Sequence, residues 1–157
     1  MSEINKQLQE YISRLEEYDT KVGIKNVELD SDITKYMNLT AEQLKLMTDE
    51  ECGIAAVILA KYSFYIQKTI NKQSAIMKWA DYNVSMLIAD SVDSYDKYMK
   101  HDMKKALIAK ENSAVSKLNE IYNTAASRVE SNNYMASRIS TISETLITLK
   151  QTKRKQK

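Results

Sequence analysis

The residues that point most clearly to a function are lysines and aromatic side chains in a segment without acidic residues. Cys52 to Ala80 spans 29 residues and contains no Asp or Glu. If this segment is a helix, an arc of about 60° on its surface collects five such side chains. They are Lys61, Tyr65, Lys68, Lys72 and Trp79. Cationic groups contact phosphates and aromatic rings stack on unpaired bases, so the pattern predicts a surface that binds single-stranded nucleic acid.

Other basic residues extend this predicted surface along the chain. They are Lys78, Lys104, Lys105, Lys153, Arg154 and Lys155. The last three belong to a tail, 150–157, that holds five basic residues and no acidic one, and we expect it to fray as a solvated arm. Two other interpretations of the lysine stripe stay open. It could be a solvated face with its aromatic rings packed at the core edge, or a basic helix lying on a membrane surface.

Catalysis and metal binding find little support in the residue types present. The only histidine, His101, lies in a charged connector with no cysteine or serine signature nearby. One histidine and one cysteine, Cys52, are too few for a zinc cluster. Two isolated glycines cannot build a phosphate-binding loop. We therefore expect no enzyme activity, no metal, no cofactor and no small-molecule substrate.

The composition predicts an all-α protein with an uneven charge distribution. Proline is absent and only two glycines occur, which suits long helices better than sheets and tight turns. Residues 1–60 carry 6 basic and 12 acidic groups, whereas residues 61–157 carry 17 basic and 9 acidic groups. The basic half is expected to meet an anionic polymer, or the two halves to meet each other.

Several features favour a cytoplasmic location. The lone Cys52 sits among apolar residues, where a thiol behaves as a small buried hydrophobe. The first residues form no apolar leader, and the longest apolar run, 53–60, is too short to span a bilayer. We therefore expect a protein that is neither secreted nor membrane-embedded.

The first half of the chain shows clear helix signals. Apolar residues at helical spacing, Tyr11 among them, predict an amphipathic helix over about 3–19, whose outer face is rich in Glu. The polar segment 20–38 is interpreted as a tether or partner-binding arm, or as a surface loop. Capping boxes at Thr40–Gln43 and Thr48–Glu51 predict a short helix to about Met47 and a long one to about 90–91.

The second half predicts another long helix, from about residue 95 or 103 to 149. Its apolar residues step by 4, 3, 4 and 3, which is a heptad seam suited to oligomerisation. They are Met135, Ile139, Ile142, Leu146 and Leu149. The expected architecture is a long, coiled-coil-like antiparallel helical hairpin over 40–149 that forms oligomers. An acidic helix and linker, 1–39, precede it, and the basic tail 150–157 follows.

Two short segments resemble a known family. Asn71-Lys72-Gln73-Ser74-Ala75-Ile76, after Tyr62 and Tyr65, is similar to a segment in the long helix of the UvsY-type recombination mediators of tailed phages. Asp102-Met103-Lys104-Lys105-Ala106-Leu107 is a looser likeness that opens the following helix. The resemblance covers roughly residues 55–150. The family's basic Leu-Lys-Ala-Arg tetrad has no counterpart near 87–94, so that DNA site is not transferred.

The resemblance implies a helical, ring-forming protein that binds single-stranded DNA and serves in recombination and repair, which for a phage protein places it in the cytoplasm of the host. Such a protein loads a RecA-like recombinase onto strands covered by single-strand-binding protein, and the acidic half is then a candidate surface for protein partners. The alternative is a structural helical assembly protein, such as a phage virion component or scaffold. The two hypotheses differ in whether the lysine stripe is exposed or forms a seam between subunits.

Overall fold

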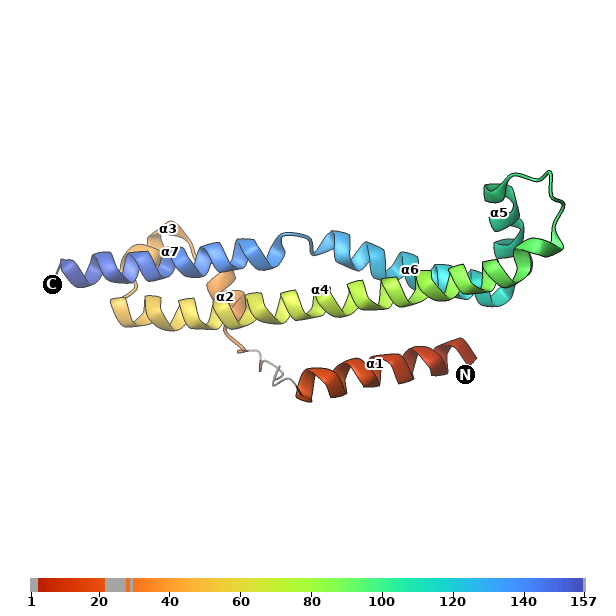
Figure 1. Ribbon diagram of the computed structural model, residues 1–157. Coiled ribbons are helices and arrows are strands. Elements are labelled where there is room, and N and C mark those ends of the chain that lie inside the picture. The colour runs from red at the N-terminus through yellow and green to blue at the C-terminus, as the bar shows by residue number, and fades with distance from the viewer. Residues whose placement is uncertain (1–2, 22–27, 29, 157) are drawn as a thin grey trace. The chain divides into compact units, whose positions relative to one another are not determined.

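The computed structural model describes residues 3–21, 28 and 30–156, and all regular secondary structure in those ranges is helical (Figure 1). The helices are α1 (Glu3–Lys21), α2 (Ile33–Met37), α3 (Ala41–Leu46), α4 (Asp49–Ser91), the 3-10 turn η1 (Val92–Ser94), α5 (His101–Glu111), α6 (Ser113–Ser131) and α7 (Met135–Lys155). The predicted all-α class is confirmed. The chain divides into two compact units: unit 1 comprises 1–24 and 71–131, and unit 2 comprises 25–70 and 132–157.

Unit 2 is built around the first part of α4 and α7, with the short helices α2 and α3 beside them (Figure 1). Its core contains small residues of α4 and larger apolar side chains from both helices. The buried members are Ala55, Ala56, Leu59, Ile66, Ala136, Ile139 and Leu146. Cys52 on α4 is fully buried, as expected for a thiol in apolar surroundings.

Two serine hydroxyls link α4 and α7 within unit 2. Ser63 donates from Oγ to the Ala136 carbonyl oxygen at 2.7 Å. Ser143, which is buried, donates from Oγ to the Ala56 carbonyl oxygen at 2.7 Å. Small residues at these positions let the backbones approach closely enough for each hydroxyl to reach a carbonyl on the other helix.

Unit 1 has a separate core formed where the end of α4 meets α5 and α6. Ile88, Ile108 and Val115 are its buried members. Val84, Leu87, Tyr95 and Ala109 pack against them. Helix α1 belongs to this unit and contacts α6, but none of its residues is buried.

Local capping chemistry fixes where α3 and α4 begin. At α3, the Thr40 hydroxyl accepts from the Gln43 amide at 3.2 Å, and the Thr40 amide donates to the Gln43 side chain at 2.8 Å. At α4, the Thr48 amide donates to Glu51 Oε2 at 2.7 Å, and the Glu51 amide donates to the Thr48 hydroxyl at 3.2 Å. Both predicted capping boxes are confirmed, as is the end of α4 at Ser91.

The second long helix was predicted wrongly, because the chain forms three helices in that region. Asn112 ends α5, and its side chain accepts from the amides of Ala114 (2.9 Å) and Val115 (3.3 Å), which caps α6. A second break over 132–134 ends with Tyr134 in the left-handed region, at φ 63°. An asparagine side chain, such as that of Asn112, can bind backbone amides and so end one helix and begin the next. The spacing of apolar residues did not reveal this break.

Two further expectations differ from the structure. Residues 33–37 form the short helix α2 inside the segment expected to be an irregular tether, of which 22–27 and 29 lie outside the described residues. The tail does not fray before its end, because α7 continues to Lys155. The basic residues of 150–155 therefore have helical backbones.

The buried face of α4 gives a direct test of the unit 2 core. Leu59 has no exposed surface, whereas Leu46 on α3 keeps 84% of its surface exposed. We expect Leu59→Ala to lower the free energy of unfolding by about 2–5 kcal/mol, because it removes buried methyl groups and leaves a cavity. Leu46→Ala, the matched control, should change it by less than about 0.5 kcal/mol. Urea unfolding followed by circular dichroism measures both, and equal effects would contradict the assigned core.

The Thr48–Glu51 capping box makes stability depend on pH. Hydrogen bonds from the Thr48 amide and then the Thr48 hydroxyl lower the pKa of Glu51 below its ordinary value. The cap therefore contributes fully above the unfolded-state pKa of about 4.3, and it is lost as pH falls through the lowered folded-state pKa.

Between neutral pH and about pH 3, we expect the melting temperature of the Glu51→Gln variant to fall less than that of the wild type. The reason is that the glutamine amide keeps an acceptor oxygen that does not titrate. Glu50→Gln removes the same charge from the same turn and should keep the wild-type pH dependence. Thermal unfolding at several pH values measures the difference. Identical pH profiles for Glu51→Gln and the wild type would show that the cap does not titrate.

Candidate nucleic-acid interface

Helix α4 carries six of the predicted strand-binding residues, and none of them is buried. Lys61, Tyr65 and Lys68 lie in unit 2, where the lysine at 61 and the tyrosine are exposed and the lysine at 68 is half-buried. The Tyr65 ring stacks against Tyr62, with centroids 6.4 Å apart and ring planes 14° apart. This part of α4 therefore presents a tyrosine pair next to cationic side chains.

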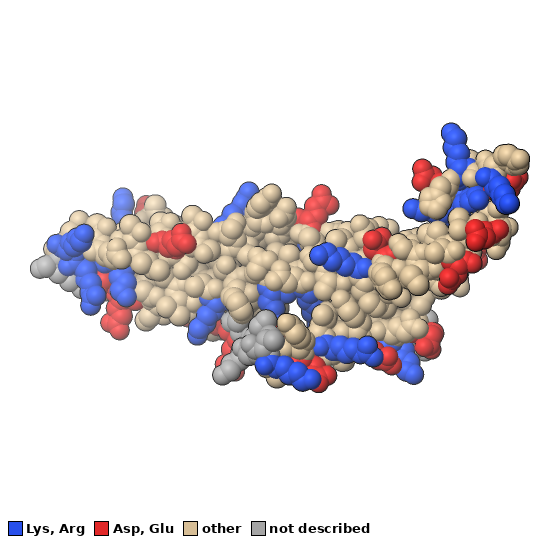
Figure 2. Space-filling view, in the orientation of Figure 1, with Lys and Arg blue, Asp and Glu red and all other residues tan. Residues whose placement is uncertain are grey.

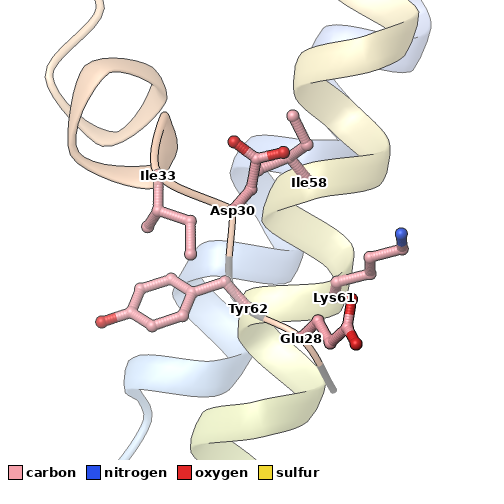
Figure 3. Close-up of a pocket in the computed structure, with 6 residues that line it drawn as sticks. All are labelled: Glu28, Asp30, Ile33, Ile58, Lys61 and Tyr62. Atoms are coloured by element: carbon pink, nitrogen blue, oxygen red, sulfur yellow. The ribbon is translucent and has the colours of Figure 1, made fainter.

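Lys61 also borders a pocket of about 170 Å³ in unit 2 (Figure 3). The lining residues are Glu28, Asp30, Ile33, Ile58, Lys61 and Tyr62. The close-up shows the amino group of Lys61 pointing outward from the pocket. The two carboxylates nevertheless place negative charge near the lysine, which opposes the approach of a phosphate on this side.

In unit 1 two of the three predicted residues on α4 are in contact with α1. Lys72 Nζ lies 2.6 Å from Glu16 Oε1, and both side chains remain partly exposed. The half-buried Trp79 ring stacks on Tyr11, with centroids 5.7 Å apart and ring planes 21° apart. Lys78, the neighbour of the tryptophan, is exposed.

The sequence interpretation missed Tyr11 and Glu16 as residues of this face. The tyrosine was assigned to the apolar stripe of an amphipathic helix, and the glutamate to its outer face. The charge imbalance between the two halves of the chain was the available signal, since it allowed the halves to meet. Periodicity within α1 could not show which segment of the chain it would contact.

The two predicted basic residues of α5 differ in exposure and in their contacts. Lys105 is exposed, whereas the half-buried Lys104 donates from Nζ to the Tyr95 carbonyl oxygen at 3.5 Å. The hydroxyl of Tyr95 donates to Glu111 Oε2 at 2.6 Å, which raises the pKa of the tyrosine above its ordinary value. Figure 2 shows Lys and Arg side chains over α5 with acidic side chains among them.

Two of the three predicted basic residues in the C-terminal region, Lys153 and Arg154, make contacts within unit 2. Lys153 donates from Nζ to the carbonyl oxygens of Leu44 at 3.0 Å, Lys45 at 2.9 Å and Met47. These carbonyls end α3, so the ammonium group caps that helix. The Nε atom of Arg154 lies 3.8 Å from Oδ2 of Asp49 at the start of α4. Lys155 is exposed.

The five residues predicted to form an oligomerisation seam differ in burial in the structure. Ile139 and Leu146 are buried in the core of unit 2. Met135 and Ile142 remain exposed, and Leu149 is half-buried. Two of the five residues thus already pack inside one chain.

Within residues 3–21, 28 and 30–156, no three His, Cys, Asp or Glu side chains gather as metal ligands. In the same ranges, no helix combines the length and the apolar character needed to cross a membrane.

No protein-family model, curated protein or solved structure matches the chain.

The contacts of Lys153 lead to a prediction about stability. We expect Lys153→Met to lower the free energy of unfolding by about 1.5 kcal/mol, the lower end for hydrogen bonds to a charged group, because the side chain is half-exposed. Methionine keeps most of the aliphatic stem but leaves three carbonyls of the α3 terminus without the ammonium. Lys155→Met is the control and should change stability by less than about 0.5 kcal/mol. Chemical unfolding of both variants measures the difference, and equal values would show that the cap is energetically neutral.

Proposed function

We propose that the protein is a non-catalytic single-stranded DNA-binding protein whose strand contacts lie on α4. The observation that carries the proposal is that all six predicted residues of this helix stay exposed or half-buried. Lys61, Tyr65 and Lys68 supply charge and a ring in unit 2. Lys72, Lys78 and Trp79 do the same in unit 1. Lysine contacts give salt-dependent affinity, and stacking on the rings favours unpaired bases without sequence preference.

The biological role that we propose is recombination mediation, in which the protein helps to load a RecA-like recombinase onto strands covered by single-strand-binding protein. The likeness to UvsY-type mediators at 71–76 and 102–107 supports this role. The first segment lies within α4, and the second lies in the opening turns of α5. We also propose a cytoplasmic location, because the single free cysteine, Cys52, suits a reducing compartment.

The proposed architecture is an antiparallel helical hairpin that assembles into a ring. Within unit 2, Ala56 of α4 is hydrogen-bonded to Ser143 of α7, and Ser63 of α4 to Ala136 of α7. Residue numbers thus increase along α4 while those of the bonded residues on α7 decrease, as expected for an antiparallel pair. Exposed apolar side chains support self-association, because large apolar patches on a surface commonly bind other protein. They include Ile54, Val57, Phe64, Met135 and Ile142.

The alternative function is a structural helical assembly protein without DNA contacts. The same exposed apolar residues favour it, and α4 would then form a seam between subunits. The two functions predict different consequences for the same lysine substitutions, which makes them separable in one experiment.

The test measures the anisotropy of a labelled oligo-dT over a range of salt concentrations, with duplex DNA as competitor. We expect tight binding at low salt that prefers the single strand. Combined Lys61→Gln and Lys78→Gln substitutions should make the plot of log affinity against log salt shallower by about 1.4, since each lost contact to a single strand removes about 0.7. Both lysines are exposed.

The matched control replaces two exposed lysines outside the predicted surface, Lys45→Gln and Lys97→Gln, and removes the same charge. It should keep the wild-type salt slope. Equal changes in both double variants would show that only net charge matters. Absence of binding at low salt, together with a change of mass by light scattering in the Lys61/Lys78 variant, would favour the assembly protein.

A further inference from the structure

Helix α1 contacts α4 in unit 1 through the same chemistry that a nucleotide strand uses. The Glu16 carboxylate lies 2.6 Å from Lys72 Nζ, as a phosphate oxygen would. The Tyr11 ring stacks on Trp79 at 5.7 Å, as a base would. The Tyr11 hydroxyl also donates to the Ala75 carbonyl oxygen at 3.4 Å, between the two contacts.

The attachment of α1 to this face is shallow. No residue of the helix is buried, and its apolar residues, such as Ile4, Leu8 and Leu15, are half-buried. The side chains of Glu16 and Lys72 keep 63% and 37% of their surfaces exposed. Ion pairs this open to water are weak and are screened by salt. A helix held in this way can be displaced by a ligand that makes the same contacts in larger number.

We infer that α1 is a displaceable cover on the strand-binding face of unit 1, with Glu16 in the place of a phosphate and Tyr11 in the place of a base. The inference rests on the proposed function and names its regulation: single-stranded DNA must compete with α1 for Lys72 and Trp79. The apparent affinity is then lowered by the fraction of molecules in which the face is covered. A cover that is in place in nine molecules of ten weakens binding about tenfold.

The test uses the full chain with Tyr11→Leu and Glu16→Gln combined, which removes the ring and the charge but keeps the helix. Because no residue of α1 is buried, the cores of both units are left intact. Glu17→Gln is the matched control, since it removes an equal charge from the next position of the same helix. Glu17 pairs with Lys21 inside α1, at 2.7 Å.

The first measurement needs no DNA. Trp79 is the only tryptophan, so its fluorescence and quenching by acrylamide report on this face alone. The double variant should be quenched more readily than the wild type, and Glu17→Gln should match the wild type. Equal quenching in all three proteins would overturn the cover, whatever the DNA result.

The second measurement is the affinity for labelled oligo-dT at one salt concentration. We expect the double variant to bind about tenfold more tightly than the wild type, and Glu17→Gln to stay within twofold. If the wild type binds and the double variant binds no tighter, the cover is wrong and the proposed function stands. If none of the three binds at low salt while the quenching differs, the proposed function fails, and with it the competition between strand and helix.

Discussion

One helix of 43 residues supplies buried side chains to two separate cores, and the rest of the structure depends on this division. In unit 2 α4 buries a run of small and apolar residues against α7, and in unit 1 it buries Ile88 with Ile108 and Val115. A helix buries only part of its circumference against its neighbours. The remaining surface of α4 is therefore available to lysines and aromatic rings, and their exposure follows from the packing.

The parts of the fold that sequence could predict are those set by local interactions. Both capping boxes involve residues three positions apart, so Thr40 and Thr48 identified the starts of α3 and α4 directly. The extent of the long helix was predictable because a capping box marks its start and the polar pair Asp90-Ser91 marks its end. The breaks near Asn112 and Tyr134 were not, since an asparagine inside a helical pattern caps or continues a helix depending on its tertiary surroundings.

The candidate interface shows the same limit for long-range contacts. Helical spacing placed Lys72 and Trp79 on an accessible face of α4, but it could not show that Glu16 and Tyr11 contact them. In the same way, the heptad spacing of α7 identified Ile139 and Leu146 as packing residues without showing that their partner is α4 of the same chain. Periodicity reports which face of a helix is apolar or charged, whereas the partner of that face depends on the whole fold.

The competition that we infer has a consequence for the length of strand that the protein selects. Helix α1 is attached to the face that it covers, so it acts at a high effective concentration and a short oligonucleotide gains little against it. A long strand meets Lys72 and Trp79 together with exposed basic residues of the same unit, such as Lys78 and Lys105. Each added phosphate contact strengthens the strand but not the helix. A cover of this kind therefore discriminates against short strands while leaving long ones able to displace it.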